Sequence, residues 1–209
     1  MAKRDLTHAK DDRSEAEFET CMFKSDMKEG IWSDILRDEI HFRNKKQVIV
    51  ENYGCGHDGK IIMNAEDVNS KPDKKFIIDG KEVLIEIKAY NKSNGDPRDM
   101  FTIKIHSLKE CVKCKGFIVL PSVNIWAILI PEGSAYLLDK IKPKIYNGFS
   151  PNDLAIRCHA TEIDLLLASD KIKMYNWSLE SKNKIEKNWN KLFIKEKKSQ
   201  LPLPEGRGL

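Results

Sequence analysis

The sequence has no long hydrophobic run, and this absence limits the classes of protein it can encode. Its most apolar stretch, GFIVLPSVNIWAILIP at residues 116–131, is interrupted by Pro121, Ser122 and Asn124. It falls short of the ~20 apolar residues that a membrane-spanning helix needs. Residues 1–19 contain no apolar segment of the kind found in a signal peptide. We therefore expect a cytoplasmic protein with no membrane partner.

Cysteine is also scarce, with five residues at irregular spacing. An odd number at irregular spacing does not indicate a disulfide framework, so reduced thiols are expected. Cys111 and Cys114 have the spacing of a zinc knuckle, and Cys55 with His57 can complete a four-ligand set. The second pair is unusually spaced and the first falls in a predicted helix. Ordinary buried thiols are therefore the preferred interpretation, with zinc as the alternative.

No large excess of charge of one sign is present. The net charge of +4 permits a polyanionic partner without requiring one. The chain has 209 residues, of which 41% are hydrophobic and 33% charged, so it can bury a core. There is no internal repeat, no low-complexity tract and no P-loop spacing. A nucleotide-binding P-loop is therefore not indicated.

The order of apolar patterns predicts a mixed α/β domain, with a β-sheet flanked by helices. The predicted divisions are a loose arm at 1–13, a core at 14–150 and a helical, basic C-terminal extension at 151–209 packed on the core. In the core we expect a helix from Ser14 that is interrupted at Gly30, with a second helix from Ser33. Further on, the patterns predict a strand at 47–53, a hairpin at 71–90, a short helix at 105–115, buried strands at 116–122 and 124–130, helices beginning near Ser150 or Asn152 and after Thr161, and an amphipathic helix at 178–198.

The hairpin KPDKKFIIDGKEVLIEIKAY, residues 71–90, carries charges where apolar residues are expected. Asp-Gly between two apolar runs is a strong signal for a two-residue turn. With Asp79 and Gly80 as the turn, paired positions sum to 159, which places Asp73 opposite Glu86. Side chains alternate between the faces of a strand, so Asp73, Glu86 and Lys88 should share one face. Directly opposed Cβ atoms lie ~5 Å apart.

Two ionised carboxylates at that separation repel each other unless a cation lies between them. Hard divalent ions such as Mg²⁺ favour such oxygen ligands, and water bound to the ion becomes a better nucleophile. Lys88 can orient that water or offset charge on a phosphate. Pro72 fits the first position of a strand. The competing interpretation is a surface hairpin whose polar side chains merely face solvent, and the combination of register and charge favours the metal site.

Pro72-Asp73 followed by Glu86-Ile87-Lys88 resembles the motif of the PD-(D/E)XK nuclease superfamily, in the hairpin form of restriction endonucleases and Holliday-junction resolvases. The resemblance spans roughly residues 14–130 and implies a restriction-endonuclease-like core with the element order αβββαβ. It further implies that Asp73 and Glu86 hold Mg²⁺, for which Mn²⁺ can substitute. The resemblance likewise implies the Ile87 carbonyl as a further ligand and Lys88 as the group that assists attack of water on a phosphodiester.

Many members of this superfamily add an acidic residue from the first helix. Glu15 precedes Phe18 by three residues and Met22 by seven, so it is expected beside the apolar face of that helix. Glu15 is therefore the first candidate, with Glu19 in reserve. An acidic first turn that complements the helix dipole explains either residue equally well.

The resemblance implies a Mg²⁺-dependent endonuclease acting on DNA, of restriction type or homing type and suited to a homodimer. A Holliday-junction resolvase or repair nuclease, a catalytically silent nucleic-acid-binding domain and an α/β interaction protein with an accidental motif are the alternatives. Basic side chains that can contact nucleic acid are Lys60, Arg98, Lys184, Lys187 and Lys191. The last three lie in an amphipathic segment whose lysines are equally explained as a solvated helix face.

Overall fold

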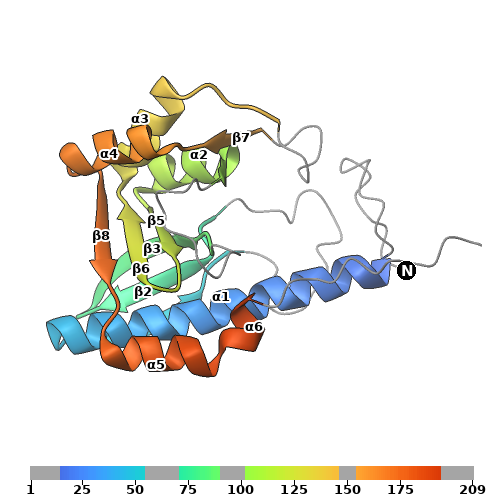
Figure 1. The fold of residues 1–209 in the computed structure, drawn as a ribbon, viewed down its shortest axis with the longest axis vertical. Coiled ribbons are helices and arrows are strands. Elements are labelled where there is room, and N and C mark those ends of the chain that lie inside the picture. Colours follow the sequence, from blue (N-terminus) through green and yellow to red (C-terminus); the bar gives the residue numbers. More distant parts are fainter. Residues whose placement is uncertain (1–14, 55–70, 90–101, 146–153, 194–209) are drawn as a thin grey trace, which may run out of the picture.

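The computed structural model describes residues 15–54, 71–89, 102–145 and 154–193, and they form a mixed α/β fold (Figure 1). A six-stranded sheet has the order β1-β2-β3-β5-β6-β8, in which only the β3–β5 pair is parallel among the described strands. A two-stranded antiparallel sheet pairs β4 with β7. The strands are β1 (Val48–Asn52), β2 (Lys74–Ile78), β3 (Lys81–Ile87), β4 (Thr102–Lys104), β5 (Phe117–Pro121), β6 (Ile125–Leu129), β7 (Ala155–Arg157) and β8 (Ile172–Asn176).

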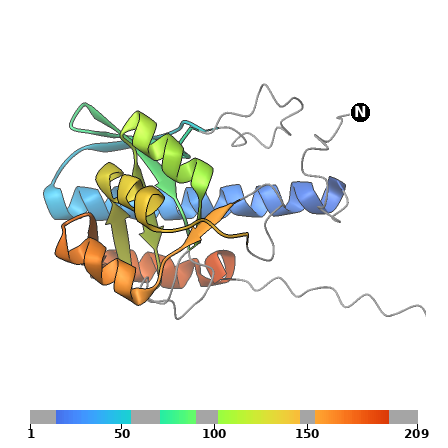
Figure 2. The ribbon, with the colours of Figure 1, turned by 90° about the horizontal axis from the view of Figure 1, so that it is seen from above.

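Helices cover both faces of the large sheet (Figures 1 and 2). On one face lie α1 (Glu15–Asn44), α5 (Leu179–Lys187) and α6 (Trp189–Phe193). Their buried side chains form one cluster with residues of β2, β3, β5 and β6, including Trp32, Phe76 and Ile87. On the other face lie α2 (Ile105–Cys114), α3 (Pro131–Lys140) and α4 (Ala160–Ala168). They share a second cluster with the small sheet and the opposite faces of β5 and β6. The α/β class is therefore confirmed.

Helix α1 is continuous from Glu15 to Asn44, so the predicted break at Gly30 was wrong. A glycine costs a helix interior only about 1 kcal/mol relative to alanine. Just after Gly30, the side chains of Trp32, Ile35 and Leu36 are each 1% exposed. Burial of each such side chain contributes about 1.5–3 kcal/mol, which outweighs the glycine penalty. The N-terminal half of α1 extends past the edge of the sheet (Figures 1 and 2).

The C-terminal segment differs from the all-helical prediction. Residues 155–157, predicted as helix, form β7, and residues 172–176 form β8 at an edge of the large sheet. Helix α3 was not predicted at all. Both strands owe their conformation to distant partners, β4 and β6, which local periodicity does not reveal. The helix predicted to start after Thr161 is present as α4, whereas positions 150–153 lie outside the described residues.

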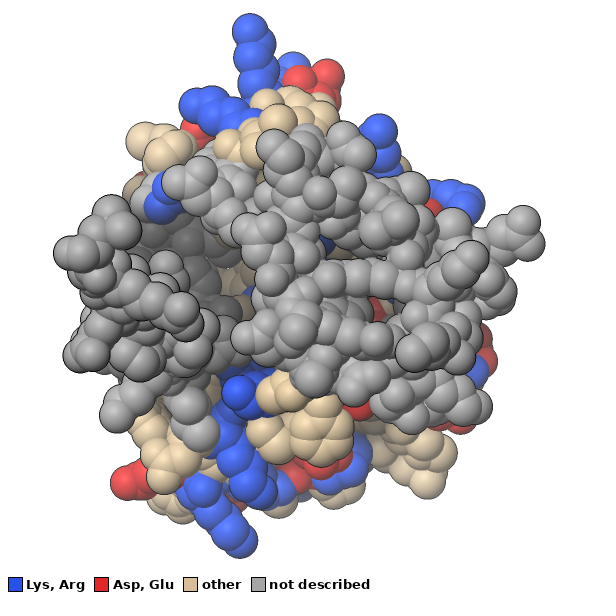
Figure 3. Space-filling model, turned by 90° about the vertical axis from the view of Figure 1, so that its right-hand side faces the viewer, with Lys and Arg blue, Asp and Glu red and all other residues tan. Residues whose placement is uncertain are grey.

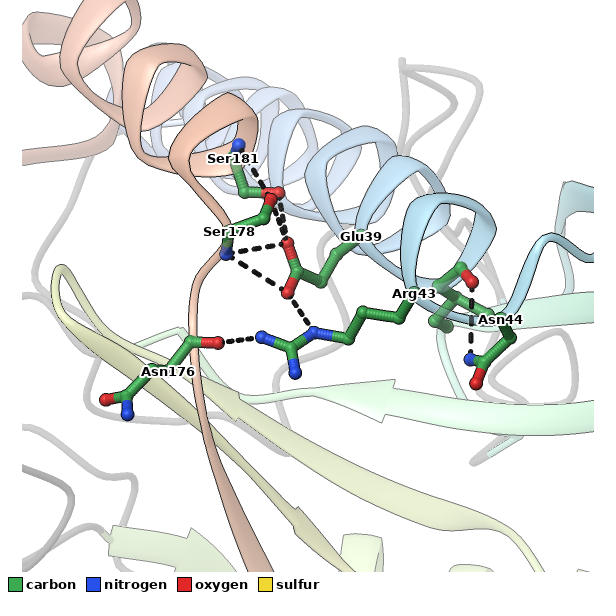
Figure 4. A network of polar contacts seen from close by, with 7 residues as sticks. Glu39, Arg43, Asn44, Asn176, Ser178 and Ser181 are labelled. Carbon is green, nitrogen blue, oxygen red and sulfur yellow. Dashed lines mark hydrogen bonds and ion pairs between the residues drawn. The ribbon is translucent and has the colours of Figure 1, made fainter.

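A buried carboxylate ties the C-terminal segment to α1 (Figure 4). Glu39 of α1 is 0% exposed and accepts hydrogen bonds from the backbone N–H and hydroxyl of Ser178 and from the hydroxyl of Ser181. Arg43, one turn further on α1, donates to Glu39 and to the backbone oxygen of Asn176. Ser178 is also the N-cap of α5, as its hydroxyl accepts from the N–H of Ser181. This clamp fixes the start of α5 on α1.

Candidate functional site

The hairpin of β2 and β3 has the predicted turn and register. Asp79 and Gly80 have φ values of 49° and 78°, as a type I′ turn requires. Pairing runs from Ile78↔Lys81 to Lys74↔Ile85, so paired positions sum to 159 as predicted. The left-handed conformation at Gly80 costs little because glycine has no Cβ.

This register brings Asp73 and Glu86 together at the open end of the hairpin. The backbone N–H of Asp73 donates to Oε2 of Glu86 at 3.2 Å. In return, Oδ2 of Asp73 accepts the backbone N–H of Ile87 at 2.8 Å. Each carboxylate thus holds the backbone of the other's strand, which fixes their separation where the regular pairing ends. The predicted proximity of Asp73 and Glu86 is confirmed.

The other face of β3 carries its apolar residues. Ile85 and Ile87 are 5% and 3% exposed and belong to the cluster beneath α1. Glu86 points the opposite way, toward α2, where its Oε1 accepts the hydroxyl of Ser107 at 2.9 Å. The alternation of faces predicted for β3 is therefore present.

Lys88 is paired with Glu86, as its Nζ lies 2.5 Å from Oε1 of that carboxylate. Its backbone N–H donates to the oxygen of Val119, which extends the β3–β5 pairing past the end of β3. Burial alone would lower the pKa of Lys88, but the negative charges of Glu86 and Asp73 outweigh it and raise the pKa. Lys88 is therefore a firmly held ammonium group beside the two carboxylates.

A third carboxyl group, that of Glu29 on α1, lies close enough to interact electrostatically with Asp73 and Glu86. Burial, followed by the negative charge of Asp73, raises the pKa of Glu29 to about 8, and Glu86 adds to the effect. Lys88 and Lys74 oppose this shift. Glu29 was missed because Gly30 was taken as a helix break. The usable signal was its spacing, since Glu29 precedes Trp32 by three residues and Leu36 by seven, both on the buried face.

The side chains of Glu15 and Glu19 lie outside the described residues, although the backbone of both is part of α1. At 1.5 Å of rise per residue, Glu15 lies about 21 Å and Glu19 about 15 Å along the axis from Glu29. Whether either contributes to the site stays a prediction. Among the glutamates of α1 whose side chains are described, Glu29 interacts electrostatically with Asp73 and Glu86.

Lys74 adds a buried positive charge on the α1 face of the hairpin. Its side chain is 3% exposed and its Nζ donates to Oδ1 of Asn52 on β1 at 2.7 Å. Lys74 pairs with Ile85, so it lies on the face opposite to Glu86. Lys74 and Lys88 thus lie on opposite faces of the sheet, and the charge of each lowers the pKa of Glu29.

The donor set suits a hard divalent cation. Carboxylates of Asp73 and Glu86 and the carboxyl group of Glu29 are oxygen ligands of the kind that Mg²⁺ prefers. Burial is the main cause of the raised pKa of Glu29, and the negative charges of Asp73 and Glu86 add to it. A cation near these groups would offset that repulsion. Within the described residues no three His, Cys, Asp or Glu side chains already converge tightly enough to hold a metal ion.

The remaining candidate residues are scattered. Lys60, Arg98, Cys55 and His57 lie outside the described residues. Lys184 of α5 forms an ion pair with Asp38 of α1, so its side chain links these two helices. Lys187 on α5 and Lys191 on α6 are exposed. Figure 3 shows Lys and Arg side chains projecting from the described surface, with Asp and Glu among them.

Cys111 and Cys114 are both on α2 and both carry free thiols. Burial raises the pKa of each thiol, and the charge of Glu86 adds to the effect. Cys111 is buried and Cys114 is half-buried, while Cys55 and His57 lie outside the described residues, so a zinc site at these four residues stays a prediction.

No model of a known protein family matches this chain, and no curated protein sequence matches it significantly. Among the described residues, no helix is both long enough and apolar enough to cross a membrane. The function of this chain is therefore inferred from the geometry of the site.

Proposed function

We propose that this protein is a Mg²⁺-dependent endonuclease that hydrolyses phosphodiester bonds in DNA, of restriction type or homing type. The observation that carries the proposal is the placement of Asp73, Glu86 and Lys88 at the open end of one hairpin, with mutual hydrogen bonds and an ion pair. The order of elements supports it. With the three-residue β4 set aside, α1 to β5 follow the order αβββαβ of the PD-(D/E)XK core that the motif resembles.

Asp73, Glu86 and the main-chain oxygen of Ile87 are the proposed ligands of Mg²⁺, with Glu29 as the acidic residue from α1. The bound ion would neutralise charge on the scissile phosphate and make an attacking water more acidic. Lys88 would donate a hydrogen bond to that water and would offset negative charge that develops on the phosphate. Its raised pKa keeps this donor charged throughout the neutral range. The N–H of Ile87 donates to Oδ2 of Asp73 and so restricts the orientation of this carboxylate.

The decisive experiment combines four variants with three forms of DNA. Purified protein is incubated with plasmid, single-stranded and four-way-branched DNA, in Mg²⁺ or in chelator. Asp73→Ala and Lys88→Met should lower the cleavage rate about 10²–10⁴-fold, as loss of a catalytic group typically does. Glu29→Gln should also reduce it. Glu82→Gln is the matched control, since Glu82 lies on the same strand and its side chain is 64% exposed.

Each outcome discriminates between the candidate functions. Discrete plasmid fragments would favour a site-specific enzyme, while preferential cutting of branched DNA would favour a resolvase. Binding without cleavage would indicate a catalytically silent domain. If the wild-type protein cuts none of the three substrates, or if Asp73→Ala cuts as fast as wild type, the proposal is wrong.

Because cutting both strands at a symmetric target suits paired subunits, we also propose a homodimer, which sedimentation velocity would test.

A further inference from the structure

Helix α2 contributes a buried hydroxyl to the site. Ser107, the third residue of α2, is 3% exposed, and its hydroxyl donates to Oε1 of Glu86 at 2.9 Å. Serine in the first helical turn commonly caps the helix, yet the N-cap position of α2 is Lys104, which makes no side-chain cap. The Ser107 hydroxyl is directed at a carboxylate on a neighbouring strand. Its role therefore lies at the site and not in the helix end.

The carboxylate of Glu86 is held by donors from three separate segments. Oε1 accepts from Ser107 and lies 2.5 Å from Nζ of Lys88, while Oε2 accepts the N–H of Asp73 at 3.2 Å. Lys88 and the N–H of Asp73 belong to the hairpin itself, whereas Ser107 comes from α2. Because a serine side chain has few torsions, its hydroxyl holds the carboxylate against α2 at little cost in conformational entropy.

The core fixes the position of Ser107 itself. The N–H of Ile105 at the start of α2 donates to the oxygen of Leu154 at 3.0 Å. The preceding strand β4 pairs with β7, and Leu108 and Cys111 on α2 are 0% and 1% exposed. A hydroxyl mounted on an element packed this closely has little freedom to move. The C-terminal half of the chain, through Leu154 and β7, thus supports a donor at the hairpin site.

We infer that Ser107 is a positioning residue: its hydroxyl holds the carboxylate of Glu86 in the orientation needed to bind a divalent cation. This inference rests on the proposed function, because Glu86 is a proposed metal ligand. A hydrogen bond that holds a metal-binding side chain in its binding orientation raises metal affinity, because that side chain then loses less conformational freedom when the metal binds. In Ser107→Ala, Oε1 keeps only its ion pair with Lys88, and the carboxylate loses the one described donor that holds it from α2.

Binding of Mn²⁺ in the absence of DNA tests the inference without depending on activity. Ser107→Ala should weaken Mn²⁺ binding, measured by calorimetry or by electron paramagnetic resonance, by about 10–100-fold. Ser134→Ala is a matched control. Ser134 is also a buried serine in the first half of a helix, α3, and its Oγ has no hydrogen-bond partner among the described residues. Its removal should leave Mn²⁺ affinity unchanged.

A second measurement separates positioning from loss of structure. In Mg²⁺-supported cleavage, Ser107→Ala should raise the Mg²⁺ concentration for half-maximal rate while leaving the KM for DNA unchanged. A general loss of folding would instead lower the concentration of active enzyme and change neither value. Should Ser107→Ala prove too unstable to purify, Ser107→Cys fills the same space with a weaker donor, and an intermediate loss of Mn²⁺ affinity is expected.

The possible results distinguish this inference from the proposed function. If wild type binds Mn²⁺ and cuts DNA but Ser107→Ala matches Ser134→Ala in Mn²⁺ affinity, the role assigned to Ser107 is wrong and the nuclease proposal stands. If wild type neither binds Mn²⁺ nor cuts DNA, the proposed function is wrong, and the inference is lost with it. Weakened Mn²⁺ binding in Ser107→Ala, with an unchanged Ser134→Ala, would support both.

Discussion

The buried Glu39 offers the most quantitative test of how this fold is held together. Its carboxylate joins α1 to the start of α5 through Ser178 and Ser181, and it is bonded by Arg43 on its own helix (Figure 4). Glu39→Gln keeps the size of the side chain and replaces one oxygen with an amide group that donates. At least one N–H or O–H group of Ser178 or Ser181 would then face the new amide NH₂ group, which cannot accept a hydrogen bond. The charge opposite Arg43 would also be lost.

The expected cost follows from these contacts. Hydrogen bonds to a charged group contribute about 1.5–3 kcal/mol each, and removing one partner of a buried charged network costs about 3–5 kcal/mol. Arg43 is 39% exposed, so water compensates part of its loss. We therefore expect Glu39→Gln to lower the free energy of unfolding by about 3 kcal/mol. For a chain of this length, that corresponds to a fall in Tm of about 6–12 °C.

The effect should depend on pH in a defined direction. Burial alone would raise the pKa of Glu39, but hydrogen bonds from Ser178, Ser181 and Arg43 outweigh it and lower the pKa below the ordinary value. A carboxyl group with a depressed pKa stabilises the fold above its unfolded pKa, and this stabilisation is lost as the pH falls through its folded pKa. The difference between wild type and Glu39→Gln should thus be constant near neutrality and shrink in acid.

Urea unfolding at several pH values measures both predictions. Glu186→Gln is the control, because Glu186 is an exposed glutamate on α5, the helix that Glu39 holds, and should change stability by less than about 0.5 kcal/mol. A Glu39→Gln protein as stable as wild type at pH 7 would refute the view that this carboxylate clamps α1 to α5. A stability difference that grows in acid would refute the assigned direction of the pKa shift.

Three further substitutions test the site, its hairpin and helix α1. In chelator, Glu29→Gln should make the protein more stable than wild type at pH 9 by on the order of 2 kcal/mol, since the pKa of Glu29 is raised to about 8 and its protonated form is the favoured one. This gain should vanish below pH 4.5 in urea unfolding, and an equal gain at pH 4 and pH 9 would contradict the shift. Gly80→Ala should destabilise the hairpin by about 1 kcal/mol, because Gly80 has φ of 78°. Gly30→Ala, within α1 and with open space where its Cβ would lie, should instead stabilise the protein, and the same denaturation assay compares the two.

The hairpin could be predicted from sequence because everything that determines it is local. The turn at Asp79 and Gly80 sets the register, and the alternation along β3 sends Ile85 to one side and Glu86 to the other. The buried strands β5 and β6 were likewise evident from their continuous apolar runs. Strands β7 and β8 were not, because their pairing partners lie far away along the chain.

The proximity of Asp73, Glu86 and Lys88 follows from the sequence, since these three residues lie at one end of a hairpin whose turn leaves a single register. Which side chains of other elements lie beside these three residues depends on the tertiary structure. Glu29 approaches because the packing of α1 on the sheet fixes the rotation of that helix, and Ser107 approaches because β4 and β7 anchor α2. Local propensities set the shape of each element, whereas the direction in which a helix presents its polar residues follows from how its apolar face is buried against the rest of the chain.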